Sequence, residues 1–586
     1  MTNRSSLAYS VGDLAAVIVI AYVAVFVASN TFAATYFVLP SGKDSNVGSQ
    51  KSPWKTIQHA TDKVYPGDTV FVGGGTYSGK VNFTQNGTSN RPITFRNIDG
   101  QTPILDGGST VINGYDSLVW FKNVSHIKFS GFEIKNSSSY NLYVGGESHH
   151  LEISDNNIYG AGASNVFIEG PNSQPAFSKF INNKVHNAYQ GGITLWYSLG
   201  GYYTFENNEV YGNVGNSNYD GLQIGGGASS DKGLHHIVVR NNHIYDNGKA
   251  EQGEDNLDLG GHFLNHHYLV EFNDVHGNIG SFKLNSGDIL IPGSLKAGVS
   301  GHHIARFNKF TGIGWNGYNQ PNPIVFYSNT FVDSGTWLQF YSDGSPGKPS
   351  FGNSTYIFDS DTGRMNWKNN LFWQEKSALD AYGILTAGTP PVDMSYSSVK
   401  LQNNMYRFNG QRIGVSKNSI YSAVKPADFE TYQTWNEPNK QDIDSNSTIV
   451  NSSSMFANIS SRNFELVKGA PAIDKGIALT KATNSGINSI LLKVDRASYF
   501  QDGYCVKHEC LSMPDSIVIG NNTPIDIVSI NDLDNTIILA SPATWQSGTA
   551  VTLPYFGSAP DIGAYEYSPI SSQSRTLKRA SPAKPK

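Results

Sequence analysis

Four acidic residues and one lysine have the types and spacing needed to hold a cation and to move a proton. Each lies within, or just before, a short run that reads apolar, any residue, apolar. Alternate residues of a strand point to opposite faces, so the middle residue of each run faces away from a core that the apolar residues enter. Stacked runs would place the lysine on one wall and gather the four acids at one corner of two adjacent coils, so that five side chains come together. They are Asp220, Glu254, Asp255, Asp258 and Lys283.

The clustered acids favour a divalent cation, and Ca²⁺ above all. Carboxylates brought this close repel one another, whereas Ca²⁺ takes oxygen ligands at about 2.3 to 2.6 Å. Acidic loops are more often simply solvated, and it is the shared register that favours a metal site. In that register Lys283 is the neighbour of Asp258, where a neutral amine could abstract a proton; an ordinary surface lysine is the alternative. The predicted wall runs Thr194, Gln223, Asp258, Lys283, and the predicted calcium ligands are Asp220, Glu254, Asp255 and Asp258.

A repeat along the chain predicts the elements that position this wall. Between residues 150 and 410 an Asn returns nine times, each copy followed by any residue and then by apolar or aromatic residues. The copies lie 21 to 41 residues apart, which is too irregular for helical repeats and fits a solenoid with variable loops. We predict a parallel β-helix in which each Asn amide bonds to its copies about 4.8 Å above and below. The copies are Asn156, Asn183, Asn208, Asn242, Asn273, Asn308, Asn329, Asn370 and Asn404.

Composition agrees with one elongated all-β molecule. Of the 586 residues only 15% are charged and 60 are Gly, which excludes helical bundles and coiled coils. Residues 53–60 have helical spacing and should form a helix that caps the open end of the solenoid. We assign residues 35–478 to the β-helix, 479–570 to a small C-terminal β domain and 571–586 to a basic disordered tail.

The N-terminal residues 1–34 read as an export signal, because an uncharged apolar stretch runs from Leu14 to Ala28. An uncleaved membrane anchor is the alternative. We expect a secreted, extracellular protein, in which Cys505 and Cys510 either form a local disulfide or remain two free thiols. The formal net charge is -5, and the basic tail leaves the rest of the chain more acidic still. Nucleic acid is therefore a poor partner, and an anionic polymer would need a bridging cation.

On these residues the chain resembles the family 9 polysaccharide lyases, pectate lyases built on a right-handed parallel β-helix. Asp220-Gly221 is similar to an Asp-Gly step of that family, and the run 254–258 is similar to its Asp-Asp-Gly-Trp-Asp run. Ser281-Phe282-Lys283-Leu284 is similar to its Gly-Phe-Lys-Leu run. The run 254–258 departs from the family at three places, with Glu254 for Asp, Asn256 for Gly and Leu257 for the aromatic.

The resemblance covers roughly residues 36–478 and implies a function. It implies that Asp220, Glu254, Asp255 and Asp258 bind Ca²⁺ and that Lys283 is the base of a β-elimination on pectate (polygalacturonate). Free Lys titrates near 10.4, so an alkaline optimum is expected. We expect a monomer whose partner is this anionic polysaccharide.

Three other functions remain open from the residues. A lyase acting on another uronate polymer such as alginate could share the site, because fold and calcium do not choose the sugar. A β-helix glycoside hydrolase would use two or three carboxylates and no lysine base. A non-catalytic surface carbohydrate-binding protein would leave Lys283 replaceable. Finally, the His pairs at 149–150, 235–236, 266–267 and 302–303 are interpreted as repeated turn positions rather than zinc ligands.

Overall fold

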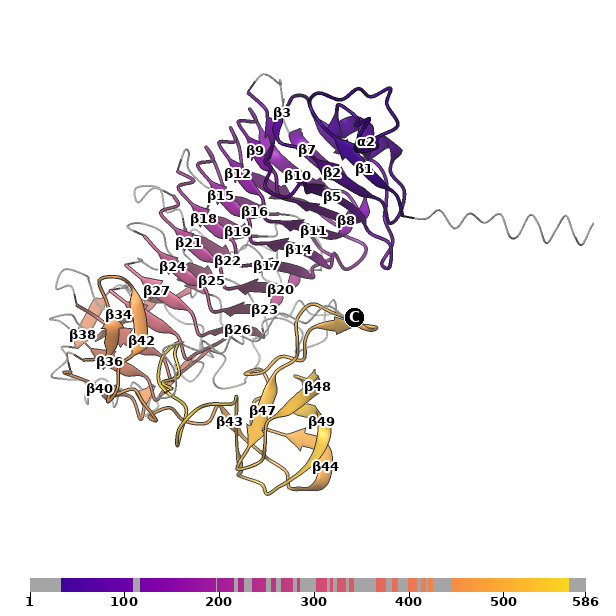
Figure 1. Cartoon of the computed structure of the whole chain (residues 1–586). Helices are drawn as coiled ribbons and strands as arrows, with labels where there is room; N and C mark the ends of the chain where they lie inside the picture. Colours follow the sequence, from indigo (N-terminus) through magenta and orange to yellow (C-terminus); the bar gives the residue numbers. More distant parts are fainter. Residues whose placement is uncertain are drawn as a thin grey trace, which may run out of the picture.

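The computed structural model is a long solenoid of short strands, whose coils stack like steps in Figure 1. Three parallel sheets run along the described part of it. The residues that the structure describes are 33–108, 116–196, 198–214, 220–225, 234–248, 255–259, 265–277, 282–284, 302–312, 317–319, 324–333, 337–341, 365–375, 382–387, 399–407, 413–417, 420–424, 444–452 and 454–568.

Most coils contribute one strand to sheet 1 and one to sheet 3, and the earlier coils also contribute one to sheet 2. Sheet 1 consists of β1 (Thr35–Val38), β2 (Thr69–Val72), β5 (Ile93–Asn97), β8 (Ser125–Ser130), β11 (His149–Ser154), β14 (Ser178–Ile181), β17 (Tyr203–Glu206), β20 (His235–Arg240), β23 (His266–Glu271), β26 (His303–Arg306), β29 (Ile324–Tyr327), β32 (Met365–Lys368), β35 (Val399–Gln402) and β39 (Asp444–Ser445). Sheet 2 consists of β4 (Val81–Phe83), β7 (Ser117–Lys122), β10 (Tyr140–Gly145), β13 (Val166–Ile168), β16 (Ile193–Leu195), β19 (Leu222–Ile224), β22 (Leu257–Leu259) and β25 (Phe282–Leu284). Sheet 3 consists of β3 (Gly75–Tyr77), β6 (Pro103–Asp106), β9 (Glu133–Lys135), β12 (Asn157–Tyr159), β15 (Lys184–His186), β18 (Glu209–Tyr211), β21 (His243–Tyr245), β24 (Asp274–His276), β27 (Lys309–Thr311), β30 (Thr330–Val332), β33 (Leu371–Trp373), β36 (Met405–Arg407) and β40 (Thr448–Ile449).

Beyond sheet 2 a further sheet continues the solenoid, and its first strand contacts β25. It consists of β28 (Gly317–Asn319), β31 (Trp337–Tyr341), β34 (Tyr382–Ala387), β37 (Ile413–Lys417) and β38 (Ile420–Val424).

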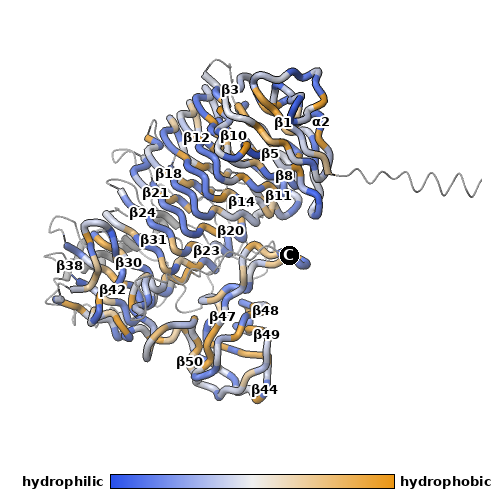
Figure 2. Tube along the Cα trace, viewed as in Figure 1, coloured by the Kyte–Doolittle hydropathy of each residue, from blue (hydrophilic) through white to orange (hydrophobic). Residues whose placement is uncertain are grey.

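One continuous apolar core fills the solenoid. The apolar residues of each strand enter it while their neighbours point away, and apolar and polar segments alternate along the coils in Figure 2. On sheet 2, Leu222, Ile224, Leu257 and Leu259 are all buried in this core. Burying one such side chain contributes roughly 1.5–3 kcal/mol, so a slip of one residue, which would turn all of them outward, is strongly disfavoured.

The predicted Asn ladder is confirmed. The nine side chains form an unbroken series in which Nδ2 of each donates to Oδ1 of the next at 3.0 to 3.1 Å. Each Oδ1 also accepts the backbone N–H of the preceding copy, as Asn183 does from Asn156 at 3.1 Å. The residue before each Asn has a positive φ, for example 57° at Asp155. The ladder therefore pairs the backbone groups that these sharp turns would otherwise leave unpaired.

The predicted capping helix is α2 (Ile57–Lys63). The side chain of Thr56 caps its first turn by accepting from the backbone N–H of His59 at 3.2 Å. Ile57 and Ala60 are buried in the solenoid core, and Thr61 donates to the carbonyl oxygen of Asn82 in β4 at 3.0 Å. The helix thus covers the first coil.

The small C-terminal domain is an antiparallel sheet packed against the flank of sheet 1. Its cluster joins Val238, Leu269 and Ile304 of the solenoid to Leu492 and Ile537 of the domain. Its strands are β43 (Thr480–Lys481), β44 (Gly486–Lys493), β47 (Ser516–Ile519), β48 (Ile525–Asn531), β49 (Thr536–Trp545) and β50 (Ala550–Thr552). A hairpin of β45 (Cys505–Val506) and β46 (Glu509–Cys510) lies within the same part of the chain. A second hairpin, β41 (Phe456–Asn458) with β42 (Asn463–Leu466), packs on the solenoid instead, where Phe456 and Phe464 join Trp373.

A buried ion network locks this interface. Arg306 donates to both carboxylate oxygens of Asp515 at 2.8 and 2.9 Å and to Glu271 at 2.6 Å. Burial alone would raise the pKa of Glu271, but Arg306 and Arg240 outweigh burial and lower it. Removing one partner would leave an uncompensated buried charge, at a cost of about 3–5 kcal/mol.

The end of the chain differs from the expectation. Residues 560–567, assigned from the sequence to the small domain, pack on the solenoid, where Ile562 joins Val332, Leu371 and Trp373. Of the two cysteine states left open, the structure shows Cys505 bonded to Cys510. No helix in the described ranges is both long and apolar enough to cross a membrane. Residues 1–32 and 569–586, which carry most of the predicted export signal and the basic tail, lie outside the described residues.

Candidate functional site

The predicted wall exists in the predicted register. Thr194 on β16 is the Cα partner of Gln223 on β19, and Gln223 is the partner of Asp258 on β22. Asp258 is in turn the partner of Lys283 on β25. The apolar neighbours of the first three residues lie in the core, so these residues point away from it. Lys283 belongs to the wall by its backbone position.

The three wall residues whose side chains the structure describes are buried rather than open to solvent. Thr194 is 1%, Gln223 8% and Asp258 7% exposed. Low exposure lowers the effective dielectric, so charges here interact more strongly than they would on an open surface. Any cation or substrate that reaches the wall would therefore exchange water for protein groups.

Three of the four predicted metal ligands lie together. One carboxylate oxygen each from Asp220, Asp255 and Asp258 lies within 4.8 Å of the others, and all three residues are buried. Asp220 Oδ1 accepts the backbone N–H of Asp255 at 2.6 Å, and Asp220 Oδ2 accepts the amide of Gln223 at 2.8 Å. Glu254 lies outside the described residues. We call Asp220, Asp255 and Asp258 the acid trio.

The donor chemistry of the acid trio suits a hard cation. Three carboxylates offer up to six oxygen atoms and no nitrogen or sulfur, which is the ligand type that Ca²⁺ prefers. Without a cation, three negative charges so close in a buried site would repel one another. Gln223, on the predicted wall but given no role there, orients Asp220 through its hydrogen bond.

The position next to Asp220 requires glycine, Gly221, because a neighbouring side chain approaches its backbone closely. A Cβ at Gly221 would lie 2.5 Å from Nδ2 of Asn247, and a Cβ at Gly192 would lie 2.8 Å from Nδ2 of Asn213. These two Asn side chains fill the space over the two glycines and link a second ladder, which runs through Asn141, Asn165, Asn213, Asn247 and Asn256 at 2.7 to 3.2 Å. Sequence reasoning missed this ladder.

The second ladder ends at the acid trio and explains one of the departures from the family pattern. Asn256 lies beside Gly221 in the register, since the backbone N–H of Leu222 donates to its carbonyl oxygen at 3.0 Å. Its own side chain accepts from Asn247 at 3.1 Å and donates to the carbonyl oxygen of His276 at 3.1 Å. Asn256 supplies the ladder amide itself, so no glycine is needed there. The ladder fixes the backbone between Asp255 and Asp258.

Comparison with known families decides the relationship. A family model described as "Pel9A-like, right handed beta helix region" matches residues 36–336, just over half of the chain. The chain belongs to this family. The match to this right-handed β-helix family confirms the resemblance to the family 9 pectate lyases seen in the sequence. The acid trio and β25 lie inside the matched residues.

Individual relatives of this Pel9A-like chain are distant. It is 33% identical over 132 residues to the uncharacterized protein YwoF of Bacillus subtilis, which is 21% of this chain and 28% of YwoF. It is 26% identical over 144 residues to pectate lyase PEL9 of Emericella nidulans, which is 22% of this chain and 35% of that protein. The chain thus spans about a third or less of the curated relatives it matches.

Solved structures of similar fold include pectate lyase Pel9A and XylC in complex with xylose. The match to Pel9A covers 92% of this chain and 97% of that chain, at 13% identity and a TM-score of 0.44. The match to XylC covers 88% of this chain and 99% of that chain, at 12% identity and a TM-score of 0.46.

The wall of this Pel9A-like β-helix continues beyond Thr194 with aromatic residues. This aromatic part of the wall was not predicted from the sequence. Thr194 is the Cα partner of Phe167, followed in register by Tyr143 and Trp120. Their rings contact one another, with centroids 5.6 Å apart for Tyr143 and Phe167 and 5.5 Å apart for Trp120 and Tyr143. The signal was present, because each is the middle residue of a short apolar run.

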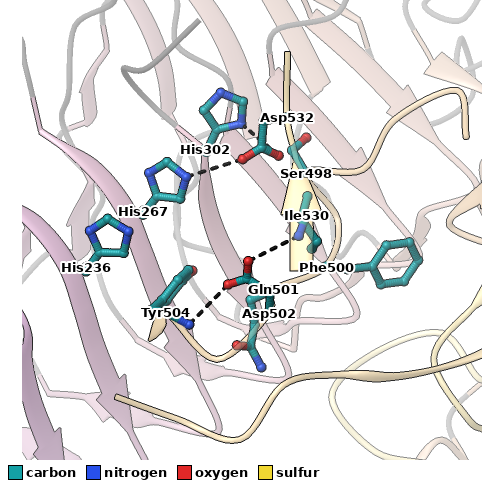
Figure 3. A pocket seen from close by; sticks show the side chains of 10 residues that line it. All are labelled: His236, His267, His302, Ser498, Phe500, Gln501, Asp502, Tyr504, Ile530 and Asp532. Atoms are coloured by element: carbon teal, nitrogen blue, oxygen red, sulfur yellow. Dashed lines mark hydrogen bonds and ion pairs between the residues drawn. The ribbon is translucent and has the colours of Figure 1, made fainter. Parts of the chain in front are cut away.

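A separate cavity of about 180 Å³ lies between sheet 1 and the C-terminal domain (Figure 3). Figure 3 shows Asp532 of the domain between His267 and His302 of the solenoid, at 3.3 and 3.4 Å. Burial alone would raise the pKa of Asp532, but the two imidazoles outweigh burial and lower it. This cavity holds none of the predicted site residues. Of the residues predicted at turns, His150, His236 and His267 lie inside β11, β20 and β23, and His302 directly precedes β26. All four have a positive φ.

Proposed function

We propose that this chain is a calcium-dependent polysaccharide lyase that cleaves pectate (polygalacturonate) by β-elimination, with Lys283 as the base. The observation that carries the proposal is the buried acid trio, whose member Asp258 lies on the wall and is paired in register to Lys283. Membership of the Pel9A-like family supports the same reaction class.

The chain's own groups account for each step. In a uronate polymer the C5 hydrogen lies next to a C6 carboxylate, whose negative charge resists removal of that proton. Asp220, Asp255 and Asp258, with Glu254, would hold a Ca²⁺ that neutralises this carboxylate when bound. The neutral amine of Lys283 takes the C5 proton, the C4–O bond breaks, and a C4–C5 double bond forms. The leaving oxygen keeps the electron pair of the C4–O bond and takes up a proton from solvent water, which gives one unsaturated and one ordinary chain end.

The surrounding residues position this chemistry. Gln223 orients Asp220 by its hydrogen bond, and the second ladder holds the backbone from Asp255 to Asp258. Burial of the wall strengthens the attraction between the cation and an anionic sugar. The cation also accounts for how an acidic chain could hold a polyanion. Secretion, with residues 1–34 as signal or anchor, belongs to the same proposal, as does a monomeric state.

The test is the rise in ultraviolet absorbance from unsaturated uronate, with polygalacturonate at alkaline pH. The expected result is a calcium-dependent rise that chelator removes and that falls by at least about 10²- to 10⁴-fold in Lys283→Ala. Lys184→Ala on β15 is the matched control, because it removes a strand lysine of sheet 3 and should leave the rate unchanged.

The same assay separates the alternatives. Saturated reducing ends without absorbance would indicate a glycoside hydrolase, and a rise only with alginate would indicate another uronate. The loss of the aromatic at Leu257 makes that second arm worthwhile. Full activity in Lys283→Ala would refute the lysine base, and folded protein inactive on every polymer would favour a carbohydrate-binding role.

A further inference from the structure

A column of stacked rings runs along sheet 1, one ring from each of seven coils. Every member has a positive φ, between 42° and 63°. Neighbouring ring centroids lie 4.4 to 5.5 Å apart. The column accepts imidazole, phenyl and phenol alike, so stacking alone does not require a nitrogen at any position. Its members are His126, His150, Phe177, Tyr202, His236, His267 and His302.

The first two rings of the column meet a third imidazole. The positive φ of His150 turns its side chain toward that of His149, and their Nδ1 atoms lie 2.6 Å apart. The ring of His126 lies 4.4 Å from that of His150 and 5.5 Å from that of His149. One ring nitrogen from each of the three lies within 4.8 Å of the other two. Among the described residues, the acid trio is the one other group of three that meets this distance.

A carboxylate stands behind the middle imidazole. Nε2 of His150 lies 2.9 Å from Oε2 of Glu509, which belongs to the disulfide-closed hairpin β45–β46 of the C-terminal part. A histidine that binds a metal through one ring nitrogen commonly donates its other N–H to a carboxylate, which fixes the ring and strengthens the ligand. His150 has this arrangement, with Nδ1 facing His149 and Nε2 facing Glu509.

Neutral imidazole is the form of histidine that binds metal. All three residues are half-buried, which leaves a path for an ion from solvent.

We propose that His126, His149 and His150 form a site for a borderline divalent transition-metal ion such as Zn²⁺, with Glu509 as the carboxylate partner of His150. Three nitrogen donors suit this ion and do not suit Ca²⁺, so the site is chemically distinct from the acid trio. Zn–N bonds of about 2.0–2.1 Å are reached by small side-chain rotations from the observed spacing. Because Glu509 comes from the C-terminal part, the bound ion fastens the hairpin to the solenoid.

The test uses the full chain with Ca²⁺ in excess, and measures Zn²⁺ by equilibrium dialysis and Co²⁺ by its visible absorption. The wild type should bind one ion per chain with the absorption of nitrogen coordination. His126→Phe and His150→Phe should each abolish binding, because each removes a nitrogen donor. Both variants should still fold, since the column already accepts Phe177 and Tyr202 at equivalent positions. Glu509→Gln, at a half-exposed side chain, should weaken binding by about 10- to 100-fold.

His236→Phe is the matched control, because it removes an imidazole of the same column that belongs to no group of three. It should bind like the wild type. The proposal is overturned if the wild type binds no Zn²⁺, if His126→Phe binds as tightly as the wild type, or if His236→Phe loses binding equally. Circular dichroism checks that each variant is folded, and Glu509→Gln offers a variant outside the ring column. The result is independent of lyase activity.

Discussion

One column of side chains on sheet 2 changes character halfway along. From Trp120 through Tyr143 to Phe167 it is aromatic, and from Thr194 through Gln223 to Asp258 it is polar. The backbone register is continuous across the change. The fold therefore presents the same position on every coil, and the residue at that position alone decides whether it is aromatic or polar.

The two halves also differ in what they do for stability. The aromatic half forms its own cluster, in which Tyr140 and Phe167 lie 4.8 Å apart, and aromatic pairs stabilise by about 0.5–1.5 kcal/mol beyond burial. Beside the polar half, one carboxylate oxygen each from Asp220, Asp255 and Asp258 lies within 4.8 Å of the others, and ionised carboxylates so close would repel one another. We therefore predict that a bound cation would stabilise the polar coils and leave the stability of the aromatic coils unchanged.

The largest expected effect is on the polar half. Asp258→Asn removes one donor of the acid trio, so calcium-dependent activity should fall on the order of 10²-fold or more. In chelator the same variant should be at least as stable as the wild type, because one repelling charge is gone.

Activity and thermal unfolding with and without Ca²⁺ measure both effects. Asp155→Asn is the control, since it changes an exposed acid at a turn position that Asn182 and Asn207 occupy on the next coils. If Asp258→Asn were folded and its activity depended on calcium as in the wild type, the proposed difference in cation binding between the polar and aromatic halves would be wrong.

The aromatic half should respond in the opposite way. Phe167→Ala deletes a buried ring that contacts Tyr140 and Tyr143, which should cost about 3–5 kcal/mol of unfolding free energy. The cost should be the same with Ca²⁺ and with chelator, and activity per folded molecule should be retained. Denaturant titration in both conditions measures it. Lost activity in fully folded protein would mean that the aromatic half also contacts substrate.

The spacing of residues along the sequence predicted the first Asn ladder and the wall, and both predictions have one physical reason. Every coil needs an Asn at the same turn and an outward residue between two core residues, so Asn156 to Asn404 and Thr194 to Lys283 recur visibly in the sequence. The second ladder lacks such a signal. Asn165 and Asn256 precede their strands, whereas Asn213 and Asn247 follow theirs and enter over glycines. Burial of the wall and the return of residues 560–567 depend on long-range packing, which spacing does not encode.

A smaller effect is expected at Gly221, where the second ladder contacts the backbone next to the acid trio. Gly221→Ala would place a Cβ 2.5 Å from Nδ2 of Asn247 and 2.6 Å from the carbonyl oxygen of Asn256. We expect a loss of about 1–3 kcal/mol from overpacking, together with weaker calcium binding as Asp220 shifts. Gly74→Ala is the control, because its Cβ would meet nothing closer than 3.4 Å. Weaker calcium binding should appear as a higher Ca²⁺ requirement for activity; an unchanged requirement would separate the ladder from the metal site.

The smallest expected effect concerns two acidic residues that hold protons, whereas the acid trio is proposed to hold a cation. In the returning C-terminal segment, burial and the charge of Asp561 raise the pKa of Glu566 from 4.5 to about 8. Burial also raises the pKa of Asp561 from 3.8 to about 6. A raised folded-state pKa means that the folded chain holds its proton longer than the unfolded chain, so stability is full below about pH 4.5 and is lost as the pH rises through 8.

Glu566→Gln should therefore stabilise the protein at pH 8.5 by on the order of 1 kcal/mol and change little at pH 4.5. Asp534→Asn, at an exposed acid of the C-terminal domain, should show no such pH dependence. Thermal unfolding at the two pH values measures the difference. An equal effect of Glu566→Gln at both pH values would mean that Glu566 does not hold its proton in the folded state. Ca²⁺ should stabilise the protein at pH 8.5 in Glu566→Gln but not in Asp258→Asn. This result would show that the chain neutralises its carboxylates in two ways, by a proton at Glu566 and by a cation at the acid trio.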